Sequence, residues 1–266
     1  MGLCRDAVAD IDAALVALPT RLEREPVLRA GEGGDDTTAI DAAAEAAIVA
    51  RLEGAGVDGL LVSEELGEKQ LGTGGSVRVV VDPIDGSVNA KRGIPFFALS
   101  LAVADGATMD DVTFGFVFDF GSREEWVAER GSGATLNGVP LPEVPPKPAI
   151  ELLAFEGTTT AIIAAAAPAL VGTAARLRVM GSLALSLCHL AAGRLDGVCS
   201  LKPARSIDIA AAQLIARERG CALELFEAPP FSRAPLDLGQ RSRLAAARTR
   251  EHCAAIASAL AVQHLG

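Results

Sequence analysis

Residues 77–98 carry the side chains best suited to chemistry, in the sequence VRVVVDPIDGSVNAKRGIPFFA. The apolar, β-branched run before Asp82 predicts a buried strand that brings this carboxylate to a sheet edge, and Pro83 predicts a turn there. Asp85 follows three positions later, so the two carboxylates can converge on one point. Paired acids without a buried cation nearby in sequence are costly, and a divalent metal would offset that cost. Carboxylate ligands favour Mg²⁺, with Mn²⁺ as a possible substitute, and a chain with only three histidines disfavours a zinc site.

The turn after Asp85 is suited to binding an anion. Gly86 allows close approach to the backbone, and the N–H groups of Gly86 and Ser87 can donate to a phosphate, aided by an adjacent helix N-terminus. An acidic turn that faces water explains the same residues about equally well when the motif is taken alone. The choice between the two readings therefore depends on the other acids of the chain.

Three further acids occupy comparable positions. Glu64 follows the short apolar run GLLVS, Asp208 begins an apolar helix, and Asp41 lies in the helix after a Gly-rich loop at residues 30–36. Each alone is more readily a solvated surface residue or, for Asp208, a cap or dipole partner of its helix. Together they predict a carboxylate cluster at the carboxyl ends of strands, where α/β sheets bind ligands.

The elements that must position these residues alternate along the chain. Residues 1–140 predict an N-terminal α+β half with the metal and phosphate site, and residues 149–266 predict an α/β half with substrate-contacting residues. The Pro-rich segment at 141–148 is the expected boundary inside one compact catalytic unit. The patterns predict helices at 1–18, 38–51, 182–193 and 206–220, a closing C-terminal helix, and strands at 59–63, 77–81, 96–104, 112–120, 124–130, 151–155, 176–180, 196–202 and 222–226.

Composition narrows the class of partner. The net charge of −10 over 266 residues disfavours binding to a nucleic-acid backbone, and a phosphate substrate would need a local cation. Five scattered cysteines indicate reduced thiols and a cytoplasmic protein. The N-terminal stretch is expected to be neither a signal peptide nor a membrane span, because Asp6, Asp10 and Asp12 interrupt it.

Several segments, in order, resemble the inositol monophosphatase superfamily: GDDTTAID, VSEELG, VVDPIDGSVNAKRGIPFFALSLAV, RVMGSLALSLCHLAAGRLDG and SIDIAAAQLIARERGC. DPIDGS matches the family pattern D-P-[IL]-D-G-[ST]. The extension NAKRGIPFF is most similar to the archaeal-type branch, whose members hydrolyse fructose 1,6-bisphosphate and inositol monophosphates. The resemblance covers about residues 30–225. It implies the sugar phosphatase fold, a layered αβαβα sandwich with mixed and antiparallel sheets, and a homodimer or homotetramer.

The resemblance also implies a set of metal ligands. Those of the first metal match Glu64, Asp82 and the Ile84 carbonyl, and those of the second match Asp82, Asp85 and Asp208. Glu64 and Asp85 then also serve catalysis, because the first metal activates the attacking water and Asp85 is a candidate to protonate the leaving group.

Other matched positions concern water and substrate. Asp41 and Ser87 match a carboxylate–hydroxyl pair that orients the attacking water. Gly86 and Ser87 match the phosphate cradle, and Gly181 and Ser182 match a loop that contacts the sugar or inositol. No covalent phosphoenzyme is expected, since no histidine base is placed for Ser87.

Departures from the family pattern concern the substrate. Ile207 stands where the family usually has Trp before the last ligand, and Leu201 stands where inositol-specific members have an acid. Lys202 and Arg205 lie close by, and we expect them to read the second phosphate of fructose 1,6-bisphosphate.

Three functions stay open at this point. The first is an archaeal-type phosphatase for fructose 1,6-bisphosphate, inositol 1-phosphate or both, acting through in-line attack of a metal-activated water. The second is a phosphatase of the same superfamily for histidinol phosphate or a nucleotide 3′-phosphate. The third is a non-catalytic binding or regulatory protein on the same fold, which the acids Glu64, Asp82, Asp85 and Asp208 disfavour.

Overall fold

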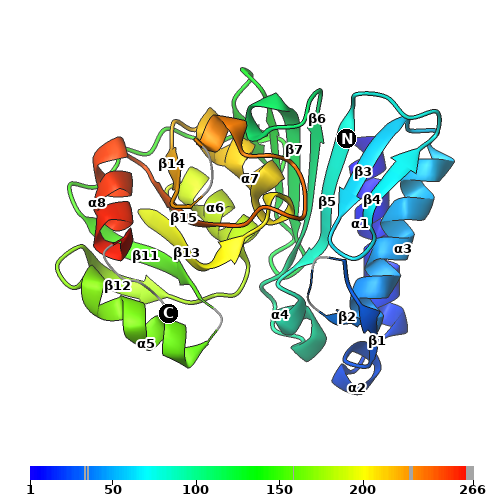
Figure 1. Cartoon of the computed structure of the whole chain (residues 1–266), viewed down its shortest axis with the longest axis horizontal. Coiled ribbons are helices and arrows are strands. Elements are labelled where there is room, and N and C mark those ends of the chain that lie inside the picture. The colour runs from blue at the N-terminus through cyan, green and yellow to red at the C-terminus, as the bar shows by residue number, and fades with distance from the viewer. Residues whose placement is uncertain (33, 35, 158, 228–229, 262–266) are drawn as a thin grey trace.

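The computed structural model describes residues 1–266 except 33, 35, 158, 228–229 and 262–266. Helices and sheets alternate in layers (Figure 1). Helices α1 and α3 cover one face of an eight-stranded sheet, α6 and α7 lie between it and a five-stranded sheet, and α5 and α8 cover the far side. This arrangement confirms the expected αβαβα sandwich with mixed and antiparallel sheets.

The elements have the following bounds. The helices are Gly2–Ala17 (α1), Arg21–Arg24 (α2), Ala39–Gly54 (α3), Ser87–Arg92 (α4), Thr160–Ala166 (α5), Leu183–Ala191 (α6), Ser206–Glu218 (α7) and Arg250–Ala261 (α8), with 3-10 turns at Met109–Asp111, Ala167–Leu170 and Phe231–Arg233. The strands are Val27–Ala30 (β1), Asp36–Thr38 (β2), Gly59–Ser63 (β3), Gly67–Leu71 (β4), Arg78–Asp85 (β5), Ala98–Ala104 (β6), Val112–Asp119 (β7), Glu125–Glu129 (β8), Ala134–Leu136 (β9), Val139–Pro140 (β10), Ile150–Glu156 (β11), Ala174–Arg178 (β12), Gly197–Ala204 (β13), Ala222–Leu225 (β14) and Ser242–Ala247 (β15). None of the helices formed by the described residues combines the length and apolar character needed to cross a bilayer.

The eight-stranded sheet brings two acids to one edge. Its order is β10-β9-β8-β7-β6-β5-β3-β4, and β3 and β5 are its parallel neighbours. Ser63 of β3 lies opposite Val81 of β5. The next residue of each strand, Glu64 and Asp82, therefore emerges at the same end of the sheet.

Helix α3 packs on this sheet through an apolar stripe. Ile40, Ala44, Ile48 and Leu52 recur every four residues and are buried in one core with the strands. Each large aliphatic side chain buried in this way contributes about 1.5–3 kcal/mol. The helix is capped by Thr38, whose backbone N–H and hydroxyl both donate to Asp41.

The middle layer fits tightly because its residues are small. Helix α7 is rich in buried alanine, and its backbone lies directly against β7 at Gly115. A Cβ on Gly115 would stand 2.6 Å from the Ala211 carbonyl oxygen. The start of α7, and with it Asp208, is therefore held at a fixed height over the sheet.

Several local expectations were wrong. Pro83 does not end its strand, because β5 continues to Asp85 through a bulge. The C-terminal stretch forms β15 before α8, where only a helix was expected. The pair β1–β2, the strands β4, β9 and β10 and helix α5 were not predicted. In the Gly-rich loop, Gly33 and Asp35 lie outside the described residues.

The expected boundary at 141–148 falls between the two large sheets, after β10 and before β11. Helices α6 and α7 follow this boundary in sequence, yet they share a core with strands of the eight-stranded sheet. The division into two halves stays a prediction.

Candidate active site

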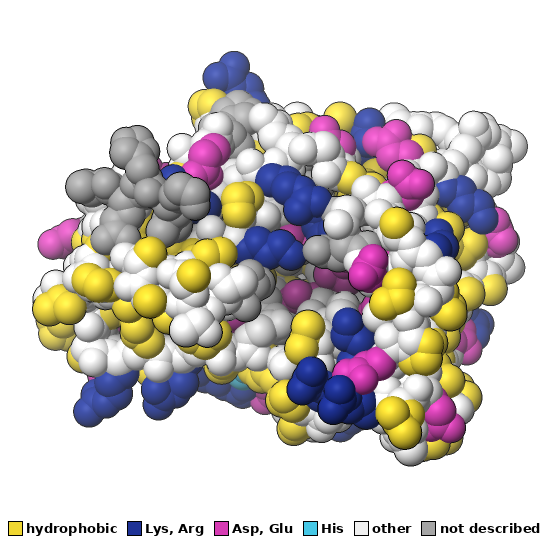
Figure 2. Space-filling view, turned by 60° about the horizontal axis from the view of Figure 1, so that its bottom comes forward, with side chains coloured by type: hydrophobic (Ala, Val, Ile, Leu, Met, Phe, Trp, Pro, Cys, Tyr) yellow, Lys and Arg dark blue, Asp and Glu magenta, His cyan; other side chains and the backbone are white. Residues whose placement is uncertain are grey.

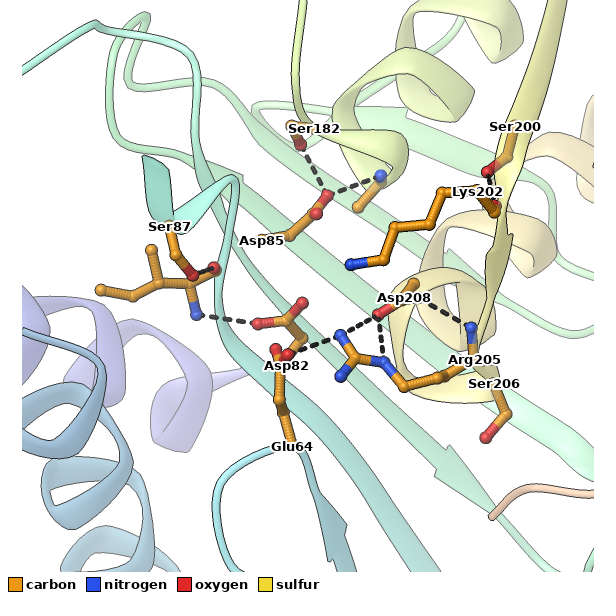
Figure 3. Close-up of polar contacts among 12 residues, drawn as sticks. Glu64, Asp82, Asp85, Ser87, Ser182, Ser200, Lys202, Arg205, Ser206 and Asp208 are labelled. Carbon is orange, nitrogen blue, oxygen red and sulfur yellow. Dashed lines mark hydrogen bonds and ion pairs between the residues drawn. The ribbon is translucent and has the colours of Figure 1, made fainter. Parts of the chain in front are cut away.

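Three elements bring four acids together. Glu64 follows β3, Asp82 and Asp85 lie at the end of β5, and Asp208 lies in the first turn of α7 (Figure 3). Figure 2 shows a hollow on this face, with acidic side chains inside it and basic side chains nearby. We call Glu64, Asp82, Asp85 and Asp208 the bridging acid group, because they come from both sides of the predicted boundary.

A bulge in β5 aims its two acids. Asp82 pairs with Ser100, and Asp85 pairs with Ala98. Between these two pairs β5 has one residue more than β6, which is a β-bulge. Pro83 sits inside the bulge, where its missing N–H costs no ladder hydrogen bond. The Asp82 carboxylate accepts a hydrogen bond from the Ile84 N–H at 3.0 Å, which fixes its direction.

Asp85 ties the strand to the C-terminal part of the chain. Its Oδ2 accepts hydrogen bonds from the Ser182 hydroxyl at 2.6 Å and from the Ala184 N–H at 2.7 Å. Burial raises the pKa of Asp85 to about 7, with a further contribution from the charge of Asp208, and the two donors oppose this rise. Ser182 also caps α6 through the Leu185 N–H, so one hydroxyl serves the helix and the acid.

Arg205 places a cation among the acids. Its guanidinium Nη2 lies 2.5 Å from Glu64 Oε1 and 3.0 Å from Asp208 Oδ1, and its backbone N–H donates to Asp208 Oδ2 at 2.7 Å. Burial would lower the pKa of Arg205, but the charges of Asp208 and Glu64 outweigh it and raise that pKa. Both the guanidinium and the backbone N–H of Arg205 thus contact acids, and the expected contact of Arg205 with a distal phosphate stays a prediction.

The acids remain hard to ionise despite this cation. Burial raises the pKa of Glu64 to about 8 against the opposing effect of Arg205. The pKa of Asp82 is raised well above its ordinary value by burial and then by the charges of Glu64, Asp85 and Asp208. The bridging acid group therefore holds excess negative potential at its centre.

The turn after Asp85 is built around a glycine, and a side chain at this position would be strained. Gly86 has φ 97°, and a Cβ there would stand 3.1 Å from the carbonyl oxygens of Gly181 and Phe96. Ser87 begins α4, and the first hydrogen bonds of the helix run from the Asn89 and Ala90 N–H groups to the Gly86 carbonyl, at 2.9 and 3.1 Å, so the N–H of Ser87 precedes the hydrogen-bonded ladder. The Ser87 hydroxyl donates to the Ile84 carbonyl at 3.0 Å.

Asp41 is buried, so the alternative of a solvated helix face is wrong. Its Oδ2 accepts from the Thr38 N–H at 3.1 Å and from the Thr38 hydroxyl at 2.5 Å. Its Oδ1 is buried without a hydrogen-bond partner among the described residues. Among the described residues, no hydrogen bond joins the side chains of Asp41 and Ser87, and their pairing stays a prediction.

The positions that depart from the family pattern lie beside the site. Leu201 and Ile207 are buried in the apolar core. Lys202 extends from β13, and Figure 3 shows its amine directed toward the space between Asp85 and Asp208.

Comparison with known proteins identifies the family. The model of the inositol monophosphatase family matches residues 6–264. The chain belongs to the inositol monophosphatase family. A protein of Thermococcus kodakarensis named fructose-1,6-bisphosphatase/inositol-1-monophosphatase is 37% identical over 188 residues, which is 70% of this chain and 68% of that protein. Pasteurella multocida Nus factor SuhB is 34% identical over 193 residues, which is 70% of each chain. The crystal structure of an inositol monophosphatase–fructose 1,6 bisphosphatase has a TM-score of 0.84 at 26% identity and covers 97% of this chain and 98% of its own.

The family implies a divalent metal, and the chemistry of the bridging acid group fits one. Its donors are carboxylate oxygens and the nearby Ile84 carbonyl, which suit Mg²⁺. The raised pKa values of Glu64, Asp82 and Asp85 show burial and crowding of like charges that a divalent cation would relieve. With Arg205 in place, however, no three His, Cys, Asp or Glu side chains of the described residues are arranged to hold a metal.

Two residues that hold the loop at Met180 and Gly181 were missed by sequence reasoning. Glu156 accepts the Gly181 N–H at 2.9 Å and the Ser186 hydroxyl at 2.8 Å. Asn89 of α4 donates to the Met180 carbonyl at 2.8 Å from the opposite side. Glu156 ends β11, so the rule that acids at strand ends mark sites would have found it, whereas nothing in the sequence marks Asn89.

Proposed function

We propose that this chain is a Mg²⁺-dependent phosphate monoester hydrolase that acts on a sugar or cyclitol phosphate. One observation carries the proposal: acids from β3, β5 and α7 meet beside the glycine turn at Gly86, in a member of the inositol monophosphatase family. An acidic protein needs such a device to bind an anionic substrate. Mn²⁺ would substitute, since it accepts the same oxygen ligands.

The bridging acid group would hold the metal. Glu64, Asp82 and the Ile84 carbonyl supply one set of ligands, and Asp82, Asp85 and Asp208 supply a second. When bound, the metal lowers the pKa of water and neutralises charge on the phosphate. Hydrogen bonds from Ser182 and Ala184 orient Asp85, and the Ile84 N–H orients Asp82, so both carboxylates are aimed before any ion arrives.

The glycine turn and the buried helix supply the remaining roles. The N–H groups of Gly86 and Ser87 bind phosphate oxygens as charge redistributes during transfer. Asp41 has one free oxygen, and with the Ser87 hydroxyl it orients water for in-line attack. Ser87 is no nucleophile in this mechanism, because its hydroxyl donates to a carbonyl oxygen and has no base beside it among the described contacts.

The substrate that we favour is fructose 1,6-bisphosphate, ahead of inositol 1-phosphate. The name of the Thermococcus kodakarensis relative includes both activities. Leu201 offers no acid to inositol hydroxyls, and Lys202 points into the site, where a second phosphate would gain a charge-assisted contact. Gly181 and Ser182 contact the sugar.

A substrate panel tests this ranking. The kcat/KM for fructose 1,6-bisphosphate, inositol 1-phosphate, histidinol phosphate and a nucleotide 3′-phosphate would be compared at fixed Mg²⁺. Lys202→Ala should raise KM for the bisphosphate more than for the monophosphate, with Lys91→Ala as the control cation. A wild-type preference for inositol 1-phosphate, or equal losses on both substrates, would reverse the ranking.

A second candidate is a non-catalytic binding protein on the same fold. It is favoured by the relative named Nus factor SuhB and by the cation inside the bridging acid group. Turnover of a generic phosphate ester that depends on Mg²⁺ and is lost in Asp208→Asn would exclude it. A cytoplasmic location and a homodimer or homotetramer belong to the same proposal; five free cysteines, all buried, support the former.

A further inference from the structure

The side chain of Arg205 fills the place where the acids converge. It is 7% exposed, and its Nη2 lies between Glu64 Oε1 and Asp208 Oδ1, at 2.5 and 3.0 Å. Its Nε is a further 3.2 Å contact to the same Asp208 oxygen, and its backbone N–H occupies the other one. Both oxygens of Asp208 and one of Glu64 are thus taken by a single residue.

A guanidinium in this position is a permanent charge. Arginine does not lose its proton in proteins, and its fork of donors matches carboxylates well. The other two acids of the group have backbone or hydroxyl donors: Asp82 is held by the Ile84 N–H, and Asp85 by Ser182 and Ala184. Glu64 and Asp208 are the members that a cation compensates, and Arg205 is the side chain that the structure shows compensating them.

Arg205 also lines a second part of the fold, outside the bridging acid group. A small cavity is lined by Arg205 together with Ser206, Ile209, Gln240 and Arg241. None of Glu64, Asp82, Asp85 or Asp208 lines it. The side chain therefore borders two environments, one acidic and one without an acid.

We propose that Arg205 is an internal counter-ion that competes with the divalent cation for Glu64 and Asp208, so that metal binding requires the guanidinium to leave the group. The inference rests on the metal site of the proposed function. It goes beyond that function because it makes cation affinity a property set by Arg205. Among the described residues, the acids are not arranged to hold a metal ion.

Competition has a measurable size. The apparent affinity of a ligand falls by the fraction of protein in the competent state, so a guanidinium that occupies the group nine-tenths of the time weakens cation binding about tenfold. Arg205→Gln removes the charge and keeps a side chain of similar polarity. It should bind Mg²⁺ about tenfold more tightly than wild type, or more.

The experiment is calorimetric titration of the full chain with Mg²⁺ alone, and with Mn²⁺ alone, in the absence of substrate. Arg205→Gln and Arg205→Lys are compared with wild type and with Arg51→Gln, which breaks an ion pair to Asp10 between α1 and α3. Arg51→Gln should leave cation affinity unchanged. Arg205→Lys should fall between wild type and Arg205→Gln, because an ammonium lacks the bidentate fork.

Melting temperature gives a second readout. Without metal, Arg205→Gln should melt below wild type, because it leaves buried acids uncompensated. Saturating Mg²⁺ should raise its melting temperature more than it raises that of wild type or Arg51→Gln. Equal or weaker Mg²⁺ binding by Arg205→Gln would overturn the proposal, since it would show that Arg205 assists the ion or does not meet it.

A third readout does not need a variant to fold. The Arg205 Nε–H signal of wild type, followed by NMR, should shift as Mg²⁺ is added and reach a new position at saturation. A signal that stays unchanged at saturating Mg²⁺ would overturn the proposal. Because no substrate is present, tighter binding by Arg205→Gln in a protein without hydrolase activity would sustain this inference and refute the proposed function.

Discussion

Glu64 and Glu65 are neighbours in sequence, yet they belong to two buried acid groups that solve the same problem differently. Glu64 is part of the bridging acid group and is paired with Arg205. Glu65 belongs to a second set, Asp41, Glu45 and Glu65, which we call the helix acid group. Its partners are hydroxyls: Thr38 for Asp41, Ser63 for Glu45 and Thr37 for Glu65.

The type of partner decides whether a group can exchange its counter-charge for another cation. A hydroxyl partner carries no charge, so Glu45 and Glu65, whose pKa values are raised by burial, lower the cost of burial by holding protons. Burial raises the pKa of Glu45 to about 7, and Glu65 adds to this rise. A guanidinium partner can be replaced by another cation, so the bridging acid group is suited to exchanging ions. Both groups contain acids whose pKa is raised, and the bridging acid group also has a cationic partner that a metal ion can replace.

The largest effect should follow loss of a bridging acid. Asp85→Asn and Asp208→Asn should each lower kcat/KM by more than about 100-fold, because loss of a residue that merely supports a metal ligand already costs about 10–100-fold. The metal-free variants should stay folded, since a repelling charge has been removed. Glu45→Gln, an isosteric change in the helix acid group, is the control and should keep most of the activity. Near-normal turnover of either Asn variant would show that the bridging acid group matters no more for activity than the helix acid group does.

Next in size is the stability of the helix acid group. The pKa of Glu45 is raised in the folded protein from 4.5 to about 7, so stability is highest while Glu45 is protonated and falls as pH rises through that window. At about 1.4 kcal/mol per pH unit, ionised Glu45 costs on the order of 3 kcal/mol at pH 8. Glu45→Gln should recover much of this cost at pH 8 and little at pH 4.

Urea unfolding at pH 4, 6 and 8 measures this effect. Glu53→Gln, an exposed position on the same helix, should follow wild type at each pH. Glu65, Glu64 and Asp85 also have raised pKa values, so a residual slope is expected in Glu45→Gln. An unchanged pH dependence in Glu45→Gln would show that Glu45 is ionised in the folded protein and would remove the contrast between the groups.

A third test concerns the link between the groups. If Asp41 and Ser87 orient one water together, Ser87→Ala should lower kcat roughly 100-fold with little change in KM. Ser87→Thr keeps the hydroxyl and should retain activity. The double variant Asp41→Asn/Ser87→Ala should be little worse than either single one. Phosphate trapped on Ser87 in a rapid-quench experiment would replace this mechanism with a covalent one.

The smallest effect is expected at Glu156, which belongs to neither group. Its carboxylate bonds the Gly181 N–H and the Ser186 hydroxyl. Glu156→Gln should loosen the sugar-contacting loop at a cost of about 1 kcal/mol, seen as a roughly fivefold rise in KM with kcat nearly constant. Glu151→Gln, at an exposed position on the same strand, is the control. A fall in kcat at constant KM would instead place Glu156 in the chemical step.

Local patterns in the sequence were sufficient for strands such as β3 and β5 and for the acids near their ends, but not for β1, β2, β4, β9, β10 and β15. The apolar runs before Asp82 and Glu64 lie in neighbouring parallel strands, so the meeting of these acids could be expected from strand geometry. The five-layer architecture followed from the family resemblance. Pro83 misled, because a bulge accommodates a residue without an N–H and lets the strand continue to Asp85.

What the sequence could not show is the contact between Arg205 and Glu64. The two residues come from different halves of the chain and meet only through the packing of α7 on the sheet. Arg205 was read as a cation beside the leaving group because no local signal shows that its side chain turns toward Glu64. The partners of Asp85 were partly foreseeable, since Ser182 stands where helix N-caps stand, but its bond to Asp85 was not.

Gly115 has a consequence for the sequences that this fold can tolerate. It lies in the middle of β7, away from the acids, and its only task is to let the backbone of α7 touch the sheet at Ala211. A single methyl group there would lift the helix that carries Asp208 away from the strands that carry Asp82 and Glu64. The spacing between these acids thus depends on the lack of a side chain at Gly115. A substitution at this position, which makes no contact with the acids, is expected to change the affinity of the site for ions.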